Sequence, residues 1–459
     1  MSRSPFDPPL EQMRAMGGNV VDLLSRFIDE RYDAPTSDYA DVEQLLTRLA
    51  AAPPTDGSDL QGLLDLVERA ARKGFDTANP GFVGYIPGGG LYASALADFI
   101  ACVVNRYTAI AAPAPALVQL EASVLRWLCD TFGLPAGSQG VLTPGGSMST
   151  LSAVVAARSA RLGEDFRGAC VYVSDEVHHC VAKAAQIAGL PRDAVRVLPT
   201  DDSLRLEPQA LRAAIVSDRA AGRVPLMAVA SAGTINTGVV DPIDAIADVC
   251  AEQDVWFHVD GAYGGFFQLT DRGRTALKGI ERADSIVLDP HKGLFLPYGT
   301  GCLLVRDGEA LRAAHEVGAH YLPRPSENPA LPDFSSYTPE LTRDFRGLRL
   351  WLPLHLHGTQ AFVDALDEKL DLARWLHAEL SAIPSLELAE GPDLSLVAFR
   401  PRTGDADGLL DRINGTGRVW LSSSPVRGRT FLRMCVLSHR TRHDRLQEAV
   451  DIIVRSLEP

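Results

Sequence analysis

The first 76 residues alternate apolar and polar positions with a helical period. Apolar residues recur three and four positions apart in LEQMRAMGGNVVDLLSRFIDERY, DYADVEQLLTRLAAAPP and LQGLLDLVERAARKG. This spacing puts the apolar side chains on one face of each helix. We predict a helical arm over residues 1–76 that packs against another surface, because such helices gain most of their stability from packing.

From residue 77 onward the pattern changes. A loop rich in Gly and Pro, NPGFVGYIPGGGLY, is followed by helical patterns at ASALADFIACVVNRY and ALVQLEASVLRWLCDTFG. Short, continuous apolar runs then alternate with helical segments, which predicts an α/β fold with a buried, mainly parallel central sheet. We assign this fold to residues 77–349. The predicted strands span residues 140–143, 169–174, 194–199, 225–231, 255–260, 285–289 and 301–306.

The C-terminal part mixes the two patterns on a smaller scale. A long helical pattern, LWLPLHLHGTQAFVDALDEKLDLARWLHAEL, precedes two strand-like runs, LSLVAFRP and TFLRMCVLS, and a final helix, RHDRLQEAVDIIVRSL. We predict a small α+β domain over residues 350–459.

Charge and cysteine content narrow the class of protein. The formal charge of −14 disfavours a nucleic-acid partner, because the chain repels polyphosphate. The seven cysteines are scattered, mostly in apolar runs, which predicts reduced, buried thiols. The N-terminus lacks an apolar signal region, and the most apolar stretch, LYASALADFIACVV, is too short to span a bilayer. We expect a soluble cytoplasmic protein without membrane contact.

A glycine turn between a strand and a helix is a candidate anion site. In LTPGGSMSTLSAVVAAR, glycines allow close approach of the backbone to a ligand, and Ser147 is placed to cap the helix. The free amides of the helix start favour an anion such as phosphate. Taken alone, the segment also fits a plain turn with a serine cap.

Three further polar residues follow predicted strands. His178 is placed to stack on a planar ring, and Asp260 ends an apolar strand, where a buried carboxylate requires a partner such as a protonated ring nitrogen. Lys292 follows the next strand; in an apolar site its pKa is lowered and its amine attacks carbonyl carbons. Individually, each residue also fits a solvent-exposed, capping or ion-pairing role. His178-His179-Cys180 is a poor metal site, because adjacent ligands lack a spaced partner pair.

These groups together match the needs of pyridoxal 5′-phosphate. Its phosphate requires helix amides, its ring a flat neighbour, its pyridine nitrogen a carboxylate and its aldehyde a lysine. In open parallel sheets, ligands bind outside the carboxyl ends of the strands, where all four groups are expected.

The motifs HVDGAYGG, DPHKG and GCLLVRD, supported by NPGFVGYIP, SDEVHH and TRDFRGLRLW, carry a resemblance along nearly the whole chain. The sequence resembles the group II pyridoxal-phosphate-dependent amino-acid decarboxylases. The resemblance implies the fold of the aspartate aminotransferase class, called fold type I, and a homodimer in which the N-terminal arm wraps the partner and the active site lies at the interface.

The resemblance also implies residue roles. Lys292 would form the Schiff base, Asp260 would pair with the pyridinium, and His178 would stack on the ring. Tyr321, in the Pro-rich segment EVGAHYLPRPSENPALPDFSS, would sit on a mobile loop and serve the protonation step. The remaining cofactor contacts implied by the family are Gly146, Ser147, His291, Ala262 and Thr234.

The implied reaction begins when the substrate amine displaces Lys292 to give an external aldimine. Carbon dioxide then leaves, and the cofactor stabilises the quinonoid carbanion. GYIPGGGLY keeps Tyr85 but places Ile86 and Gly88 where aromatic-acid decarboxylases are bulkier. We therefore expect a wider, less aromatic pocket and a bulky or conjugated amino acid. Arg346 fits a structural role, a role beside the substrate or a plain surface position.

Three alternatives to simple decarboxylation remain open at this level. The same scaffold supports decarboxylation-coupled oxidative deamination to an aldehyde, and it supports β-elimination. A non-catalytic homologue is disfavoured, because the lysine, the aspartate and the histidine are all present. The retained Tyr321 favours simple decarboxylation over aldehyde formation.

Overall fold

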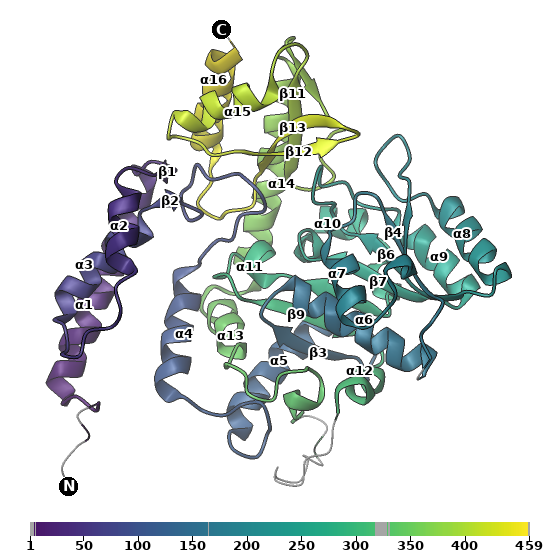
Figure 1. Ribbon diagram of the computed structural model, residues 1–459, viewed down its shortest axis with the longest axis horizontal. Helices are drawn as coiled ribbons and strands as arrows, with labels where there is room; N and C mark the ends of the chain where they lie inside the picture. Colours follow the sequence, from purple (N-terminus) through teal and green to yellow (C-terminus); the bar gives the residue numbers. More distant parts are fainter. Residues whose placement is uncertain (1–3, 5, 164, 317–327, 329–330, 458–459) are drawn as a thin grey trace.

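Figure 1 shows an N-terminal arm beside a large body that holds the central sheet, with a smaller C-terminal body above it. The computed structural model describes residues 4, 6–163, 165–316, 328 and 331–457. The arrangement confirms an α/β protein with a mainly parallel central sheet flanked by helices and a small C-terminal sheet. None of the described helices combines the length and the apolar character that crossing a membrane requires.

The arm contains the three helices that the sequence predicts. They are α1 (Leu10–Asp29), α2 (Val42–Leu49) and α3 (Leu60–Ala71). Asp59 begins α3, since its side chain accepts a hydrogen bond of 2.8 Å from the Gly62 amide. Two short strands, β1 (Ser37–Asp38) and β2 (Gly74–Phe75), pair antiparallel where the arm meets the rest of the chain.

The central sheet contains all seven strands that the sequence predicts. Their order is β3-β9-β8-β7-β6-β4-β5. β9 runs antiparallel to both of its neighbours, and the other described pairings in this sheet are parallel. The strands are β3 (Gln139–Thr143), β4 (Ala169–Ser174), β5 (Val195–Leu198), β6 (Val224–Ser231), β7 (Trp256–Gly261), β8 (Ser285–Leu288) and β9 (Gly301–Val305).

Helices cover both faces of this sheet. Neighbouring strand residues belong to different core clusters: Ile286 and Leu288 pack on one face, and Val287 packs on the other. This two-sided burial explains why the strands are continuous apolar runs. The helices of this part are α4 (Tyr92–Val104), α5 (Pro115–Thr131), α6 (Gly146–Leu162), α7 (Cys180–Ile187), α8 (Pro208–Ala220), α9 (Ile243–Gln253), α10 (Asp271–Ala276), α11 (Pro290–Gly293), α12 (Gly308–His315) and α13 (Gly347–His357).

Short 3-10 helices complete the connections. They are η1 (Glu30–Tyr32), η2 (Arg192–Ala194), η3 (Gly265–Leu269), η4 (Ile280–Arg282) and η5 (Phe334–Ser336).

The C-terminal body is an antiparallel sheet backed by helices. Its strand order is β10-β11-β13-β12. The long helical pattern after residue 350 is interrupted at Gly358, where φ is 75°, so α13 packs on α4 and α5, and α14 packs on the small sheet. The predicted boundary at residue 350 therefore falls inside α13. The elements are α14 (Thr359–Ser381), β10 (Leu386–Leu388), β11 (Leu396–Pro401), α15 (Ala406–Gly415), β12 (Ser422–Val426), β13 (Arg429–Cys435) and α16 (His443–Leu457).

Candidate active site

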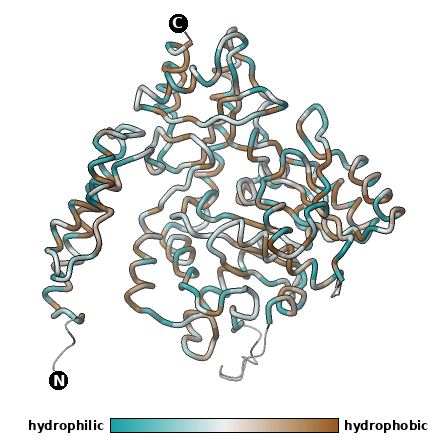
Figure 2. Tube along the Cα trace, in the orientation of Figure 1, coloured by the Kyte–Doolittle hydropathy of each residue, from teal (hydrophilic) through white to brown (hydrophobic). Residues whose placement is uncertain are grey.

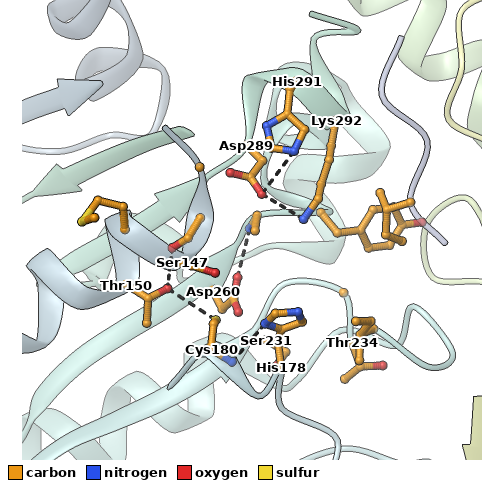
Figure 3. A pocket seen from close by; sticks show the side chains of 18 of the residues that line it. Ser147, Thr150, His178, Cys180, Ser231, Thr234, Asp260, Asp289, His291 and Lys292 are labelled. Carbon is orange, nitrogen blue, oxygen red and sulfur yellow. Dashed lines mark hydrogen bonds and ion pairs between the residues drawn. The ribbon is translucent and has the colours of Figure 1, made fainter. Parts of the chain in front are cut away.

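A cavity of about 510 Å³ lies where the carboxyl ends of β6, β7 and β8 meet the start of α6. Figure 3 shows side chains from these separate elements pointing toward one another. Its lining residues are Ile86, Pro144, Gly145, Gly146, Ser147, Met148, Thr150, His178, Cys180, Ser231, Gly233, Thr234, Ile235, Asp260, Ala262, Tyr263, Asp289, His291 and Lys292.

Lys292 enters the cavity from α11, the short helix that follows β8. Its Nζ lies 2.9 Å from Oδ2 of Asp289, and its side chain is 23% exposed. Burial lowers the pKa of Lys292, but the charge of Asp289 and its hydrogen bond outweigh burial, with a smaller effect from Asp260, so the pKa is raised. The lowered lysine pKa expected from the sequence is therefore wrong for this state, because a buried carboxylate stands beside the amine.

Asp260 lies near the end of β7 and faces the same cavity. Its Oδ1 accepts a hydrogen bond of 3.1 Å from the Ala262 amide, which fixes the carboxylate relative to the strand end. Asp260 contributes to the charge around Lys292, so the anion and the amine share one electrostatic environment. Pyridoxal phosphate requires an amine at its aldehyde and a carboxylate at its ring nitrogen. Lys292 and Asp260 bring these two groups to one cavity.

His178 presents a neutral ring to the cavity. Its Nδ1 accepts a hydrogen bond of 3.1 Å from the Cys180 amide, so the proton of the neutral ring lies on Nε2. Burial, with smaller contributions from His179 and Lys292, lowers the pKa of His178 to about 4. A neutral, flat imidazole is suited to stack on an aromatic ring.

The glycine turn leads directly into α6. The helix begins at Gly146 with Gly145 as its N-cap, so Ser147 lies inside the first turn and the predicted capping role of Ser147 is wrong. Glycine allows a close approach here, since a Cβ on Gly146 would lie 3.0 Å from Oδ2 of Asp289, tighter than an ordinary contact. The first amides of a helix lack intrahelical acceptors, and they favour an anion.

The described residues fit pyridoxal phosphate. The cavity combines a lysine amine, a carboxylate, a neutral imidazole and a helix start, and each matches one part of that molecule. In addition, Oδ1 of Asp289 is buried without a hydrogen-bond partner in the described part of the chain. A buried oxygen of this kind indicates room for a polar ligand.

Two further predicted contacts, His291 and Thr234, line the cavity as well. Nδ1 of His291 lies 2.7 Å from the carbonyl oxygen of Thr300, and the Thr234 hydroxyl lies 3.2 Å from that of Thr237. Both side chains are thereby oriented by backbone or neighbouring groups.

The predicted substrate residues do not all lie at the cavity. Ile86 lines the cavity, but Tyr85 and Gly88 are not among its lining residues. Tyr85 is 53% exposed and its ring centroid lies 5.4 Å from that of Trp420. The Gly88 amide donates a 3.2 Å hydrogen bond to the Tyr298 hydroxyl.

Two other predicted residues lie elsewhere. Arg346 is 4% exposed, pairs with Glu340 at 2.8 Å and Asp344 at 2.6 Å, and is absent from the cavity lining. It is a buried structural cation, neither a surface arginine nor part of this cavity. Tyr321 lies outside the described residues.

Sequence reasoning assigned no role to several lining residues. Asp289 stands in the DPHKG motif, but an aspartate before proline is also a common turn residue. Cys180 was considered only as a thiol or a metal ligand; burial raises its pKa to about 12, and its Sγ lies 3.7 Å from the Thr150 hydroxyl. The sequence feature that could have indicated Asp289 and Cys180 is that both lie at or after the end of a predicted strand.

Comparisons with known proteins agree with this geometry. Residues 43–402 match the family model described as the pyridoxal-dependent decarboxylase conserved domain. An aromatic-L-amino-acid decarboxylase from Bacillus atrophaeus is 32% identical over 94% of this chain and 92% of its own length. The chain therefore belongs to the pyridoxal-dependent decarboxylase family.

Other relatives extend the comparison. A phenylacetaldehyde synthase from Arabidopsis thaliana is 28% identical and covers 96% of this chain and 95% of its own length. The crystal structure of Oryza sativa TDC with PLP and tryptamine superposes with a TM-score of 0.92 at 28% identity, covering 99% of each chain. The protein is a pyridoxal-phosphate-dependent amino-acid decarboxylase with the fold-type I architecture of this family.

Proposed function

We propose that this chain removes the α-carboxylate of an L-amino acid with a bulky, uncharged side chain, giving the amine and carbon dioxide. The observation that carries the proposal is the meeting of Lys292, Asp260 and His178 in one cavity at the carboxyl ends of the strands. The decarboxylase relatives support the reaction type.

Each side chain has a distinct task in this proposal. Pyridoxal phosphate, when bound, supplies an electron sink for the electron pair left by carbon dioxide. Lys292 supplies the amine that holds the cofactor aldehyde, and Asp260 supplies the negative charge for the ring nitrogen. His178 covers the ring with a neutral imidazole, and the first amides of α6 hold the phosphate near Gly146 and Ser147.

The composition of the cavity supports an uncharged substrate side chain. Among the described lining residues, Lys292 is the one lysine, and there is no arginine. A substrate side-chain carboxylate would lack a bidentate cation, whereas Ile86, Met148 and Ile235 supply apolar surface. We include conjugated amino acids in the substrate class, because Ile86 lines the cavity at a position where the resemblance implies bulkier residues in aromatic-acid decarboxylases.

A second candidate is decarboxylation coupled to oxidative deamination. The phenylacetaldehyde synthase among the relatives favours its inclusion. One experiment separates the reactions: the holoenzyme is incubated with a panel of amino acids and conjugates, and products are identified by mass spectrometry. Amine with carbon dioxide supports the proposal. Aldehyde with ammonia and peroxide supports the second candidate, and a β-elimination product contradicts both.

A non-catalytic protein is tested by the same incubation. A holoenzyme that forms no spectral species with any panel member, while still holding the cofactor, would support a binding role.

We propose that Tyr321 serves the protonation step. Tyr321→Phe should then shift the products from amine toward aldehyde, and an unchanged product ratio would contradict this role.

We further propose a homodimer. Figure 2 shows hydrophobic positions along α4 and the arm helices, and many of these side chains are exposed in the described chain. Phe99 is 57% and Val103 70% exposed on α4. Further exposed apolar side chains on these helices are Leu10, Met13, Met16, Leu24, Leu46, Leu63, Val67, Leu96 and Ile100. A patch of this extent is typical of a protein interface.

Light scattering tests the dimer. The wild-type protein should have twice the chain mass of 49.4 kDa, and Phe99→Asp should reduce it to a single chain. Ile187→Asp, at an exposed position on α7, is the control that should remain dimeric. A monomeric wild type would contradict the proposal.

A cytoplasmic location completes the proposal. All seven cysteines are free thiols. Six are buried, and Cys102 on α4 is exposed, contrary to the expectation of buried thiols throughout. Free thiols without disulfides fit a reducing compartment. Cell fractionation that recovers the protein with secreted material would contradict this location.

A further inference from the structure

Asp289 uses its side chain in an unusual way for its position. It occupies the N-cap of α11, where an aspartate ordinarily accepts a hydrogen bond from a helix amide, yet its side chain makes no such bond. Instead Oδ2 faces Nζ of Lys292 at 2.9 Å, although the residue is only 3% exposed. A buried carboxylate that gives up its cap must gain from another partner.

We propose that Asp289 is a positioning residue for Lys292: its buried carboxylate holds the lysine nitrogen inside the cavity and keeps it positively charged until the cofactor is bound. The inference rests on the proposed role of Lys292 and adds a carboxylate distinct from Asp260. Only an unprotonated amine bonds to a carbonyl carbon. The counterion therefore keeps the cofactor-free lysine unreactive toward stray carbonyl and acyl compounds.

The neighbouring histidine does not compete for this carboxylate. Nε2 of His291 lies 3.8 Å from Oδ2 of Asp289, beyond hydrogen-bonding range. Burial lowers the pKa of His291, and its Nδ1 donates to the Thr300 carbonyl oxygen, so the ring is neutral with an unprotonated Nε2. Lys292 is thus the cation that Asp289 meets within the described surroundings.

Oδ1 of Asp289 and the start of α6 support the same role for Asp289. Oδ1 of Asp289 has no hydrogen-bond partner among the described residues, so the 2.9 Å contact with Lys292 is the close ion pair of this carboxylate there. The carboxylate also lies against Gly146, the first residue of α6, where a helix dipole favours negative charge.

Several other titratable groups interact electrostatically with Lys292 or Asp289. The raised pKa of Lys292 reflects Asp289 more than Asp260. The interacting groups are Asp260 on β7, Cys180 on α7, His178 before α7, His291 on α11, Cys302 on β9 and Cys435 on β13. Burial raises the pKa of each of the three thiols and lowers that of both histidines, so these five groups are neutral near pH 7.

The test measures the reactivity of single lysines in the cofactor-free chain. Acetic anhydride reacts with unprotonated amines, and mass spectrometry resolves the lysines of this chain, which are Lys73, Lys183, Lys278, Lys292 and Lys369. Exposed Lys183 is the internal reference. Since removal of a close opposite charge shifts a pKa by about one unit or more, Asp289→Asn should raise the Lys292 to Lys183 labelling ratio at pH 8 about tenfold or more.

Two variants separate this effect from general damage. Asp284→Asn changes a carboxylate at the other end of β8, where Oδ2 accepts a 2.8 Å hydrogen bond from the Phe257 amide, and should leave the ratio unchanged. Asp260→Asn should raise the ratio less than Asp289→Asn. A ratio within twofold of wild type in Asp289→Asn overturns the inference.

Wild-type protein supplies a measurement that needs no variant. Its Lys292 should label with a midpoint at higher pH than Lys183, and a midpoint at or below that of Lys183 overturns the inference even if Asp289→Asn fails to fold. Failure of the proposed function is distinguishable: a holoenzyme lacking cofactor on Lys292 contradicts the function, whereas the labelling ratio tests Asp289 alone.

Discussion

A buried ion pair joins α5 to the segment just before α13, and breaking this pair on one side should cost the large body much of its stability. Oε1 of Glu121 lies 2.6 Å from Nη2 of Arg343, and both side chains are 0% exposed. Oε2 of the same carboxylate accepts a 3.1 Å hydrogen bond from the Gly347 amide. A Cβ on Gly347 would lie 2.4 Å from Cβ of Glu121, so the two segments approach as closely as glycine permits.

Glu121→Gln keeps the shape of the side chain and removes its charge. The Arg343 guanidinium is then left buried without a counterion, and breaking a buried pair in this way costs about 3–5 kcal/mol. Urea unfolding of the cofactor-free protein should show that loss. The surface pair of Glu11 and Arg14, with side chains 83% and 67% exposed, supplies the control: Glu11→Gln should change stability by less than about 0.5 kcal/mol.

A double variant tests whether the loss of stability arises from the unpaired charge. Glu121→Leu with Arg343→Met removes both charges, and it should be more stable than either single variant, because no uncompensated ion remains. A loss below about 1 kcal/mol for Glu121→Gln would refute the reasoning, since buried pairs broken on one side cost several times more.

Three further predictions concern the cavity and acid stability. Gly301→Ala places a methyl group 2.5 Å from the backbone carbon of Gly145, so cofactor affinity should fall about tenfold in an equilibrium titration, and unchanged affinity would show that this turn does not hold the cofactor. His178→Phe should retain cofactor binding, because it keeps a flat ring, whereas His178→Ala should weaken it; equal affinities of the two variants would argue against stacking. Burial lowers the pKa of His258 to about 4 and that of His439 to about 3, both below the ordinary 6.5 of the unfolded chain. The unfolded state then binds more protons below pH 6.5, so the urea midpoint should fall from pH 7 to pH 5, and His258→Gln should reduce that fall; equal midpoints would contradict the assignment.

The central strands were predictable because each is buried on two faces. Ile286 and Val287 pack into different core clusters, so both positions must be apolar, and the run is visible in the sequence. β12 was missed for the opposite reason. It is an edge strand of sequence SSSPV, and its serines and proline resemble a loop because one of its edges forms no ladder.

The sequence predicted those parts of the site that depend on where the strands end. His178, Asp260 and Lys292 follow parallel strands whose carboxyl ends meet at one edge of the sheet, so their meeting follows from the order of the elements. The partner of Lys292 was not predicted, because the direction of the Asp289 side chain depends on an unused helix cap. The burial of Arg346 depends on Glu340, whose position only the folded chain fixes.

Reductive trapping of the holoenzyme tests the central claim most directly. Borohydride fixes the link between a lysine and the cofactor aldehyde, and peptide mass spectrometry then locates it. The account predicts one pyridoxyl-phosphate group per chain, on Lys292. Label on another lysine such as Lys183, or a cofactor that leaves Lys292 unmodified, would contradict it.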